Sequence, residues 1–330
     1  MINKINAAKK NIKNKLQKRL IMTLLVKNEE DIVEECIEFH LRCGVDFIIA
    51  TNNNSTDKTR EILLKYQQQG LLEIIDETDD TFNQVVWVDR MIKIAKTKYK
   101  ADWIINVDAD EFWFSRYGNL KLSLPDNKNI HGIFVAGIHI NPQPAGEKFK
   151  IRENMKGVMH SRFKCLHSAK GYQKIGGGNH DVRLKLFHRK MIASNDIVVF
   201  HFWVRSLEQY EKKIVNTFKS IENGLKQGKN DISFGEHIRY HYKLYQEGKM
   251  LEIYNSIVNA DGEDYFIDNR LYDFIQNNYK NPEQTLALKY FVNNYPARSS
   301  IKYKMQKFIL SCQRRKQEIV KTLKKITQPK

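Results

Sequence analysis

The chain has 330 residues, of which 42% are hydrophobic, and a formal net charge of +17. This apolar content is enough for a folded core in one large domain or two smaller ones, and the absence of an 18-residue apolar run excludes a transmembrane helix. The amino terminus lacks the apolar segment of a secretory signal, and the four cysteines form no CxxC pair, so we expect a protein of the reducing cytoplasm.

Strands and helices alternate over the first third of the chain. Asn28 is expected to cap the first helix, and the polar stretch 52–57 to form a loop that caps the second. Four alternations imply right-handed βαβ units and a mostly parallel sheet with helices on both faces. Apolar runs predict strands at 20–26, 46–51, 71–75 and 103–108, and helical spacing predicts helices at 32–43, 58–68 and 83–98.

The pattern changes after residue 130. A longer strand is expected at 130–140, and it is followed by a polar loop. We expect a mixed region at the edge of the sheet, then a helical segment beyond Ser206. The shorter strands are predicted at 162–167, 183–188 and 197–203.

Basic residues gather at both ends of the chain. Residues 1–20 hold seven Lys or Arg and no acid, and residues 301–330 hold ten against one acid. Such ends favour an anionic membrane surface, whereas nucleic acid is not expected because stacking aromatics do not alternate with the charges. Residues 301–330 have the spacing of a basic amphipathic helix, which either lies on a membrane or packs on the body.

Three carboxylates follow the fourth predicted strand, at Asp108, Asp110 and Glu111. Side chains in a strand alternate with period two, so Asp108 and Asp110 can point the same way. Ligands of open α/β sheets sit at the ends of strands, and carboxylate oxygens suit a divalent cation that in turn holds a diphosphate. An Asp-X-Asp pattern also occurs in ordinary polar turns, so the rest of the chain has to decide.

Five motifs in order carry a resemblance to a known family. Three of them follow the first, second and fourth predicted strands, and the other two begin after residues 177 and 200. The chain resembles glycosyltransferases with the A-type nucleotide-diphospho-sugar transferase fold, close to family 2. The motifs are Val26 to Glu30, Asn53 to Thr59, Arg90 with Asp108 to Glu111, Gly178 to Asp181, and His201 to Tyr210 with Lys213.

The resemblance implies an α/β fold with a helical carboxy-terminal region. It divides the chain into a basic arm at 1–19, a catalytic domain at 20–215 and a helical region at 216–330. Arg90 would reach the diphosphate; the alternative is that it is a surface charge of the helix. Asn52 stands where the family usually has Asp. The expected donor-binding residues are Lys27, Asn28, Glu29, Asn52, Asn53, Asp57, Arg90, Asp108, Arg205 and Lys213.

The resemblance also implies a cation site. Asp110 would bind Mn²⁺ or Mg²⁺, with Asp108 beside it facing the ribose or the sugar, and His201 would complete the ligand set. An imidazole beside carboxylates favours Mn²⁺. The alternative for His201 is a core histidine with a satisfied hydrogen bond.

Inverting transfer requires a general base for the acceptor hydroxyl. Asp181 is the first choice and Glu111 the second, while His180 either positions the acceptor or acts as the base itself. The glycines at 176–178 make a loop that closes over the donor plausible.

We therefore expect a metal-dependent, inverting glycosyltransferase. It would move a sugar from a nucleotide diphosphate, UDP being favoured, to a glycan or lipid-linked acceptor in surface polysaccharide synthesis, at the inner face of the cell membrane. The alternative is a non-catalytic scaffold whose basic ends bind anionic lipid or nucleic acid.

Overall fold

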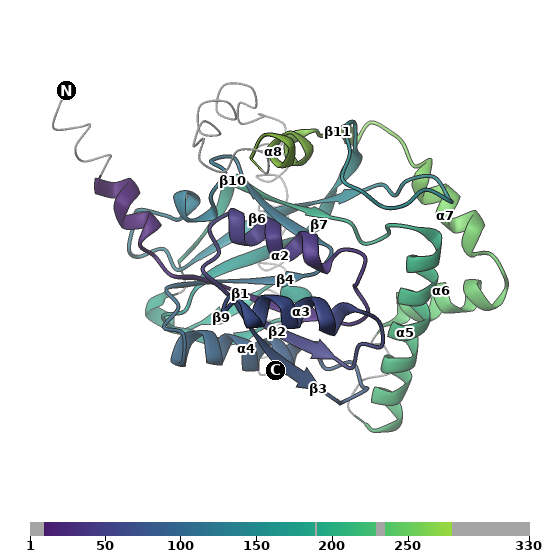
Figure 1. Cartoon of the computed structure of the whole chain (residues 1–330), viewed down its shortest axis with the longest axis horizontal. Helices are drawn as coiled ribbons and strands as arrows, with labels where there is room; N and C mark the ends of the chain where they lie inside the picture. The colour runs from purple at the N-terminus through teal and green to yellow at the C-terminus, as the bar shows by residue number, and fades with distance from the viewer. Residues whose placement is uncertain (1–9, 189, 229–234, 279–330) are drawn as a thin grey trace, which may run out of the picture.

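The computed structural model describes residues 10–188, 190–228 and 235–278. Its centre is a mixed β-sheet with helices on both faces, which confirms the predicted α/β class (Figure 1). The strands are β1 (Leu20–Val26), β2 (Phe47–Asn53), β3 (Leu72–Glu77), β4 (Trp103–Asp108), β5 (Glu111–Ser115), β6 (Gly132–Ile140), β7 (Lys156–Ser168), β8 (Tyr172–Ile175), β9 (Val182–Leu184), β10 (Met191–His201) and β11 (Tyr265–Ile267). The helices are α2 (Val33–Arg42), α3 (Thr59–Gln68), α4 (Gln84–Thr97), α5 (Leu207–Lys226), α6 (Glu236–Gln246), α7 (Met250–Val258) and α8 (Arg270–Asn278).

One half of the sheet is parallel, in the order β3-β2-β1-β4. Strands β1 and β4 are buried on both faces, which is why they read as continuous apolar runs, whereas β3 is a partly exposed edge strand. In the register of β1, Val26 lies opposite Asn52 of β2, and Leu25 lies opposite Asp108 of β4. The carboxyl ends of these three strands therefore meet at one edge of the sheet.

The other half of the sheet is mixed. Strand β7 runs antiparallel to both β4 and β6, β10 runs parallel to β6, and β5 pairs antiparallel with β10 at the far edge. This register places His201 of β10 opposite Glu111 of β5 on one side and opposite His139 of β6 on the other. The expected mixed region at the sheet edge is confirmed.

Three hydrophobic clusters hold the layers together. Helices α2, α3 and α8 pack on one face of the sheet, where Phe39 and Phe274 meet edge to face. Helix α4 and the β8–β9 hairpin cover the other face. Helices α5 and α7 share a separate cluster around Tyr210 and Tyr254, and with α6 they stand at the side of the molecule opposite the amino-terminal segment (Figure 1).

Helix α2 illustrates why the local sequence folds as it does. Its buried residues Val33, Cys36, Ile37 and His40 recur at intervals of three and four, which puts them on one face toward the sheet. The predicted cap at Asn28 is wrong: the helix begins at Val33 without a side-chain cap. Asn28 adopts a left-handed conformation (φ 56°), and its Oδ1 accepts a hydrogen bond from the backbone N–H of Thr56 instead.

Several predicted boundaries differ from the structure. Asn52 and Asn53 end strand β2 rather than starting a loop. Residues 183–188 are a strand only up to Leu184, after which the chain makes a 3-10 turn. Strand β7 begins six residues before the predicted 162, where it pairs with β6 and β11. Strand β5 is a further strand, in which the aromatic run Phe112–Phe114 is buried beside β10.

Beyond Ser206 the described chain is mainly helical, as expected, with β11 as a short added strand. The predicted domain limit at residue 215 falls within helix α5, and the division into domains stays a prediction. The basic helix predicted at 301–330 lies outside the described residues. In the part of the chain that the structure describes, no helix is long and apolar enough to cross a membrane.

Candidate active site

A cleft of about 1030 Å³ lies at the carboxyl ends of β1, β2 and β4, under helices α5 and α6. It brings together residues that are up to about two hundred positions apart in the chain. The predicted residues that line it are Lys27, Asn28, Glu29, Asn53, Asp57, Asp108, Asp110, His201 and Lys213. The predicted residues outside its lining are Asn52, Arg90, Glu111, His180, Asp181 and Arg205.

Asp110 is the most enclosed carboxylate in the cleft, with 4% of its side chain exposed. Its Oδ2 accepts from Lys213 Nζ at 2.5 Å, and its Oδ1 lies 3.4 Å from His201 Nε2. Arg205 Nη1 is 3.9 Å from Oδ2. Burial alone would raise the pKa of Asp110, but the charges of Lys213, His201 and Arg205 outweigh it and hold that pKa well below its usual range.

Asp108 belongs to a second ion cluster centred on Lys164, a residue outside the predicted site. Lys164 Nζ is 3.2 Å from Asp108 Oδ2 and 2.6 Å from Glu111 Oε1. Burial raises the pKa of Glu111. Burial would lower the pKa of Lys164, but the neighbouring carboxylates of Glu111 and Asp108 outweigh it and raise that pKa. The sequence offers one signal for this cluster, which is that Lys164 lies within the apolar run Phe163–Leu166. A lysine buried in such a run requires acidic partners.

The glycine-rich loop is anchored to this second cluster. Lys164 Nζ donates to the carbonyl of Gly178 at 2.8 Å, and the N–H of Gly178 donates to Gln84 Oε1 at 3.0 Å. The other end of the Gln84 amide, Nε2, is 3.5 Å from Asp108 Oδ1. The loop is therefore connected to the carboxylate that ends β4, and Gln84 is a second site residue missed from the sequence.

Asp181 and His180 follow this loop outside the lining of the cleft. Asp181 is exposed, and its Oδ1 accepts from the N–H of Val182. His180 Nδ1 is 2.9 Å from the carbonyl of Phe163, which makes Nδ1 the protonated nitrogen. Burial lowers the pKa of His180 to about 4, so its imidazole is neutral at pH 7.

Arg205 is fully buried and does not face the cleft. Its guanidinium donates to Glu29 Oε2 at 2.5 Å and to Asp31 Oδ2 at 2.7 Å. Glu29 and Asp31 lie in the loop between β1 and α2, so Arg205 ties that loop to the start of α5. Burial raises the pKa of Glu29, although Arg205 opposes the shift.

The polar end of β2 is held by hydrogen bonds to β3 and to the segment after it. The Nδ2 of Asn53 donates to the carbonyl of Asp79 at 2.7 Å. Asn52 instead turns to β3, where its Nδ2 donates to Asp76 Oδ1 at 2.9 Å. At the start of α3, Asp57 Oδ1 accepts from the N–H of Thr59 at 2.9 Å. Asp57 therefore stabilises the start of this helix.

Two further basic residues belong to the predicted donor-binding set, and of these Arg90 was expected to reach the diphosphate. Lys27 lines the cleft, where its Nζ lies 3.3 Å from Ser220 Oγ of helix α5, and burial lowers its pKa. Arg90 lies outside the lining and pairs with Glu77 Oε2 at 2.9 Å.

The donor set suits a cation only in part. Among residues 10–188, 190–228 and 235–278, no group of three or more His, Cys, Asp or Glu side chains is arranged to hold a metal ion. Asp110 Oδ1 and His201 Nε2, 3.4 Å apart, suit two neighbouring coordination positions of Mn²⁺ or Mg²⁺. The remaining positions would have to be filled by water or a bound diphosphate, which is how Mg²⁺ commonly binds with substrate phosphates.

The chain combines an α/β fold with a polar cleft at the carboxyl ends of its parallel strands, which is where proteins of this fold class bind their ligands. The model of glycosyltransferase family 92 matches residues 22–319, and the chain therefore belongs to that family. The predicted enzyme class is confirmed, whereas the predicted closeness to family 2 is corrected to family 92. Family and cleft together support a nucleotide-sugar glycosyltransferase.

Comparison with solved structures finds more distant similarities. The Staphylococcus aureus protein TarS (residues 1–349) in complex with UDP-GlcNAc is 10% identical, with a TM-score of 0.40, over 84% of this chain and 82% of that one. Glucosyl-3-phosphoglycerate synthase from Mycobacterium tuberculosis, in complex with Mn²⁺, UDP and phosphoglyceric acid, is 16% identical, with a TM-score of 0.26, over 39% and 46%. Scores this low carry no argument about ligands. No curated protein matches the chain.

Proposed function

We propose that the chain transfers a sugar from a nucleoside diphosphate, UDP being favoured, in a metal-dependent, inverting reaction. The observation that carries the proposal is the cleft in which two lysines, Lys27 and Lys213, lie with Asp108, Asp110 and His201 at the carboxyl ends of parallel strands. The two ammonium groups suit a diphosphate, and carboxylates with an imidazole suit the metal that a diphosphate carries. The family supports the enzyme over the non-catalytic scaffold.

The donor is oriented by the polar ends of the strands. Asn28, Asn53 and Asp57 lie on the side of β1 and β2, where amide and carboxylate groups suit the nucleoside. Lys27 and Lys213 reach the cleft from β1 and α5, and they would hold the diphosphate between them. Asp108, where β4 ends, would then face the ribose or the sugar.

Charge builds on the diphosphate as the bond to C1 of the sugar breaks. A divalent cation supplies stabilisation of that charge when bound. Asp110 and His201 are the residues that would hold it, and Lys213 adds an ammonium from the opposite side of Asp110. Asp108 is the second carboxylate of the expected ligand set, although its Oδ2 pairs with Lys164 as the Oδ2 of Asp110 pairs with Lys213.

The acceptor hydroxyl requires a base, and Asp181 remains our choice. Glu111 is fully buried and paired with Lys164. His180 donates from Nδ1 to the carbonyl of Phe163, which leaves Nε2 as its accepting nitrogen, so His180 stays the alternative base. Asp181 has an exposed carboxylate on the loop that Lys164 and Gln84 connect to Asp108. The loop has to move toward the cleft for Asp181 to reach an acceptor, and Gly178, at φ 64°, is a residue that permits such a change.

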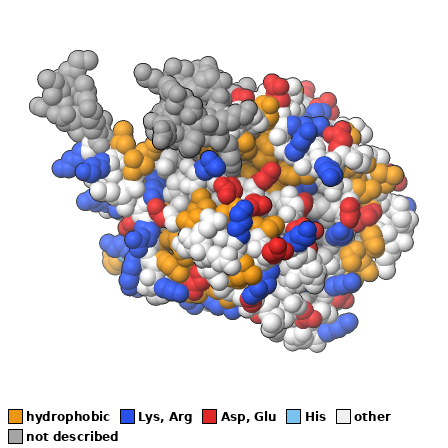
Figure 2. Space-filling view, viewed as in Figure 1, with side chains coloured by type: hydrophobic (Ala, Val, Ile, Leu, Met, Phe, Trp, Pro, Cys, Tyr) orange, Lys and Arg blue, Asp and Glu red, His pale blue; other side chains and the backbone are white. Residues whose placement is uncertain are grey.

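We also propose a glycan or lipid-linked acceptor in surface polysaccharide synthesis, at the inner face of the membrane. Basic residues gather at the sheet edge opposite the cleft, where β1, β4, β6 and β10 begin (Figure 2). Exposed apolar side chains accompany them: Ile12, Leu16 and Phe187, the last 89% exposed. Lysines with apolar side chains between them suit an anionic lipid surface.

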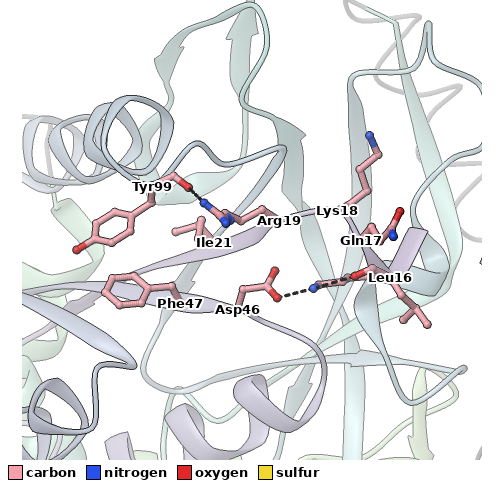
Figure 3. Close-up of a pocket in the computed structure, with 9 residues that line it drawn as sticks. Leu16, Gln17, Lys18, Arg19, Ile21, Asp46, Phe47 and Tyr99 are labelled. Carbon is pink, nitrogen blue, oxygen red and sulfur yellow. Dashed lines mark hydrogen bonds and ion pairs between the residues drawn. The ribbon is translucent and has the colours of Figure 1, made fainter. Parts of the chain in front are cut away.

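A second cavity, of about 420 Å³, lies at this basic edge (Figure 3). Its polar groups are paired within the protein: Arg19 donates to the carbonyl of Tyr99 at 2.9 Å, and Lys121 pairs with Asp46 at 2.6 Å. Since these charges have partners, we assign the cavity no ligand and treat the edge as a surface.

Binding of nucleotides tests the proposed donor site. We expect UDP with Mn²⁺ to raise the melting temperature of the wild type by several degrees, because a ligand present at about 100 times its Kd stabilises by about 2.7 kcal/mol. Asp110→Ala should lose this shift, whereas Asp261→Ala, which removes an exposed aspartate far from the cleft, should keep it. The measurement is a thermal-shift screen of UDP, GDP, CDP and ADP with and without MnCl₂. A folded wild type that responds to no nucleotide under any condition would refute the proposal.

A further inference from the structure

The pairing of Lys213 with Asp110 carries an inference beyond donor binding. Asp110 is enclosed at the end of the cleft, and its Oδ2 is held by Lys213 Nζ at 2.5 Å. Asp110 is one of the two carboxylates that a divalent cation would use. Its other oxygen, Oδ1, faces His201. In the free enzyme, the position next to Asp110 therefore already contains a positive charge.

The two basic residues around Asp110 differ in their freedom to move. Arg205 is fully buried, and Glu29, Asp31 and the carbonyl of Phe202 all accept from its guanidinium, so it is fixed in place. Lys213 is 33% exposed, and its other hydrogen-bond acceptor is the carbonyl of Trp203 at 3.4 Å. A long flexible side chain on the wall of an open cleft can leave Asp110 without disturbing the backbone.

We propose that Lys213 is an exchangeable counter-ion of Asp110. It neutralises the buried carboxylate while the cleft is empty, and it gives way when a divalent cation binds there, moving its ammonium to the diphosphate. The inference rests on the proposed donor site, and it assigns Lys213 a positioning role for the cation as well as contact with the donor.

Charge explains why the exchange needs the donor. A divalent cation at Asp110 repels the ammonium of Lys213, and a buried or half-buried ammonium without an anionic partner is unfavourable. The diphosphate gives the released ammonium a new partner. A metal without nucleotide therefore has to compete with Lys213, whereas a metal with nucleotide does not, which makes the two ligands bind cooperatively.

Removing the charge of Lys213 tests the competition directly. We expect Lys213→Met to bind Mn²⁺ alone about 10-fold more tightly than the wild type, since the competing ammonium is gone, and to bind UDP in the presence of Mn²⁺ about 10-fold more weakly. Binding of MnCl₂ alone is read from the paramagnetic resonance signal of free Mn²⁺, and binding of UDP by titration calorimetry. Neither readout depends on catalysis.

Three matched variants complete the experiment. Lys219→Met removes an exposed lysine of the same helix outside the cleft and should match the wild type in both measurements. Lys213→Arg keeps the competing charge and should retain weak binding of Mn²⁺ alone. Lys213→Gln leaves Asp110 a hydrogen-bond donor without the charge, so it serves if the Met variant does not fold, and it should behave like the Met variant.

The outcomes separate this inference from the function it rests on. If the wild type binds UDP with Mn²⁺ but Lys213→Met and Lys213→Gln bind Mn²⁺ alone no more tightly than the wild type, the counter-ion exchange is refuted and the donor site stands. If the folded wild type binds UDP equally well in EDTA, the metal dependence fails and the exchange with it. If it binds no nucleotide at all, the donor site itself is refuted.

Discussion

At the scale of single residues, the site consists of two carboxylates, each with its own lysine. Asp110 pairs with Lys213 from helix α5, and Asp108 pairs with Lys164 from strand β7. The pairing matters because a buried carboxylate without a counter-ion is strongly destabilising. It also assigns different tasks to the two aspartates, with Asp110 beside His201 and the cation position, and Asp108 beside the loop that precedes Asp181.

The residue-scale prediction concerns the base. We expect Asp181→Asn to lower the transfer rate by 10²- to 10⁴-fold, the usual contribution of general base catalysis, and to leave the affinity for UDP and Mn²⁺ within about twofold of the wild type. The rate of transfer to an acceptor is measured from the release of UDP, and the affinity is measured by calorimetry. Glu263→Gln, a change of an exposed acid outside the cleft, is the matched control. Full transfer activity in Asp181→Asn would exclude Asp181 as the base.

At the scale of elements, buried polar contacts set the spacing between helices and strands around the cleft. Arg205 joins the loop after β1 to the start of α5. On the face of the sheet covered by α2, His40 joins that helix to strand β5: its Nδ1 is 2.7 Å from the carbonyl of Cys36, and its Nε2 accepts from the N–H of Trp113 at 3.2 Å. With Nε2 as an acceptor, the imidazole of His40 has to be neutral in the folded protein.

The element-scale prediction is a loss of stability in acid. Burial lowers the pKa of His40 to about 4 from an ordinary value of 6.5. Because the folded-state pKa is depressed, the unfolded chain takes up a proton first as the pH falls, so stability is present above pH 6.5 and is lost between 6.5 and 4. At pH 5 this corresponds to about 2 kcal/mol of unfolding free energy.

His40→Gln isolates this contribution. The amide of Gln offers one donor and one acceptor but does not titrate, so between pH 7.5 and pH 5 the variant should lose about 2 kcal/mol less stability than the wild type. Urea denaturation at both pH values measures the difference. Other titrating groups are the same in both proteins and cancel. Equal losses in the two proteins would show that His40 does not carry this part of the pH dependence.

At the scale of the whole molecule, the basic residues of the amino-terminal segment and the cleft lie at opposite edges of the sheet. The cleft lies where the parallel strands end, under α5 and α6, and the lysines of residues 10–19 lie where those strands begin (Figures 1 and 2). A protein held to a membrane by this basic edge would turn its cleft away from the bilayer, where the cleft is open to a glycan acceptor.

The whole-molecule prediction concerns this edge. We expect the full chain to bind phosphatidylcholine vesicles only when they contain phosphatidylglycerol. The triple change of Lys10, Lys13 and Lys18 to Glu should weaken that binding by about 100-fold, since each lysine near an anionic surface contributes about 1 kcal/mol. Co-sedimentation measures both. The control changes Lys219, Lys226 and Lys243 to Glu on helices α5 and α6, at the other side of the molecule. Equal binding by the two triple variants would refute docking through this edge.

The alternation of apolar and helical runs was enough to predict β1, β4 and α4 close to their observed limits, because the pattern is local and repeats with the period of each element. It was also enough to place Asp108 and Asp110 at a strand end that proves to border the cleft. The aromatic run Phe112–Phe114 of strand β5 favours a strand, but its place beside β10, about 85 residues later, does not follow from a local pattern.

The sequence by itself determined the α/β class, the likeness to glycosyltransferases and nine of the polar residues that line the cleft, because each follows from a short motif or a periodic run. Tertiary structure alone decided which charges meet. It buried Arg205 between Glu29 and Asp31, and it brought Lys164 to Asp108 and Glu111. Partners so far apart in the chain leave no local pattern, since the energy of an ion pair depends on distance in space and on burial rather than on spacing in the sequence.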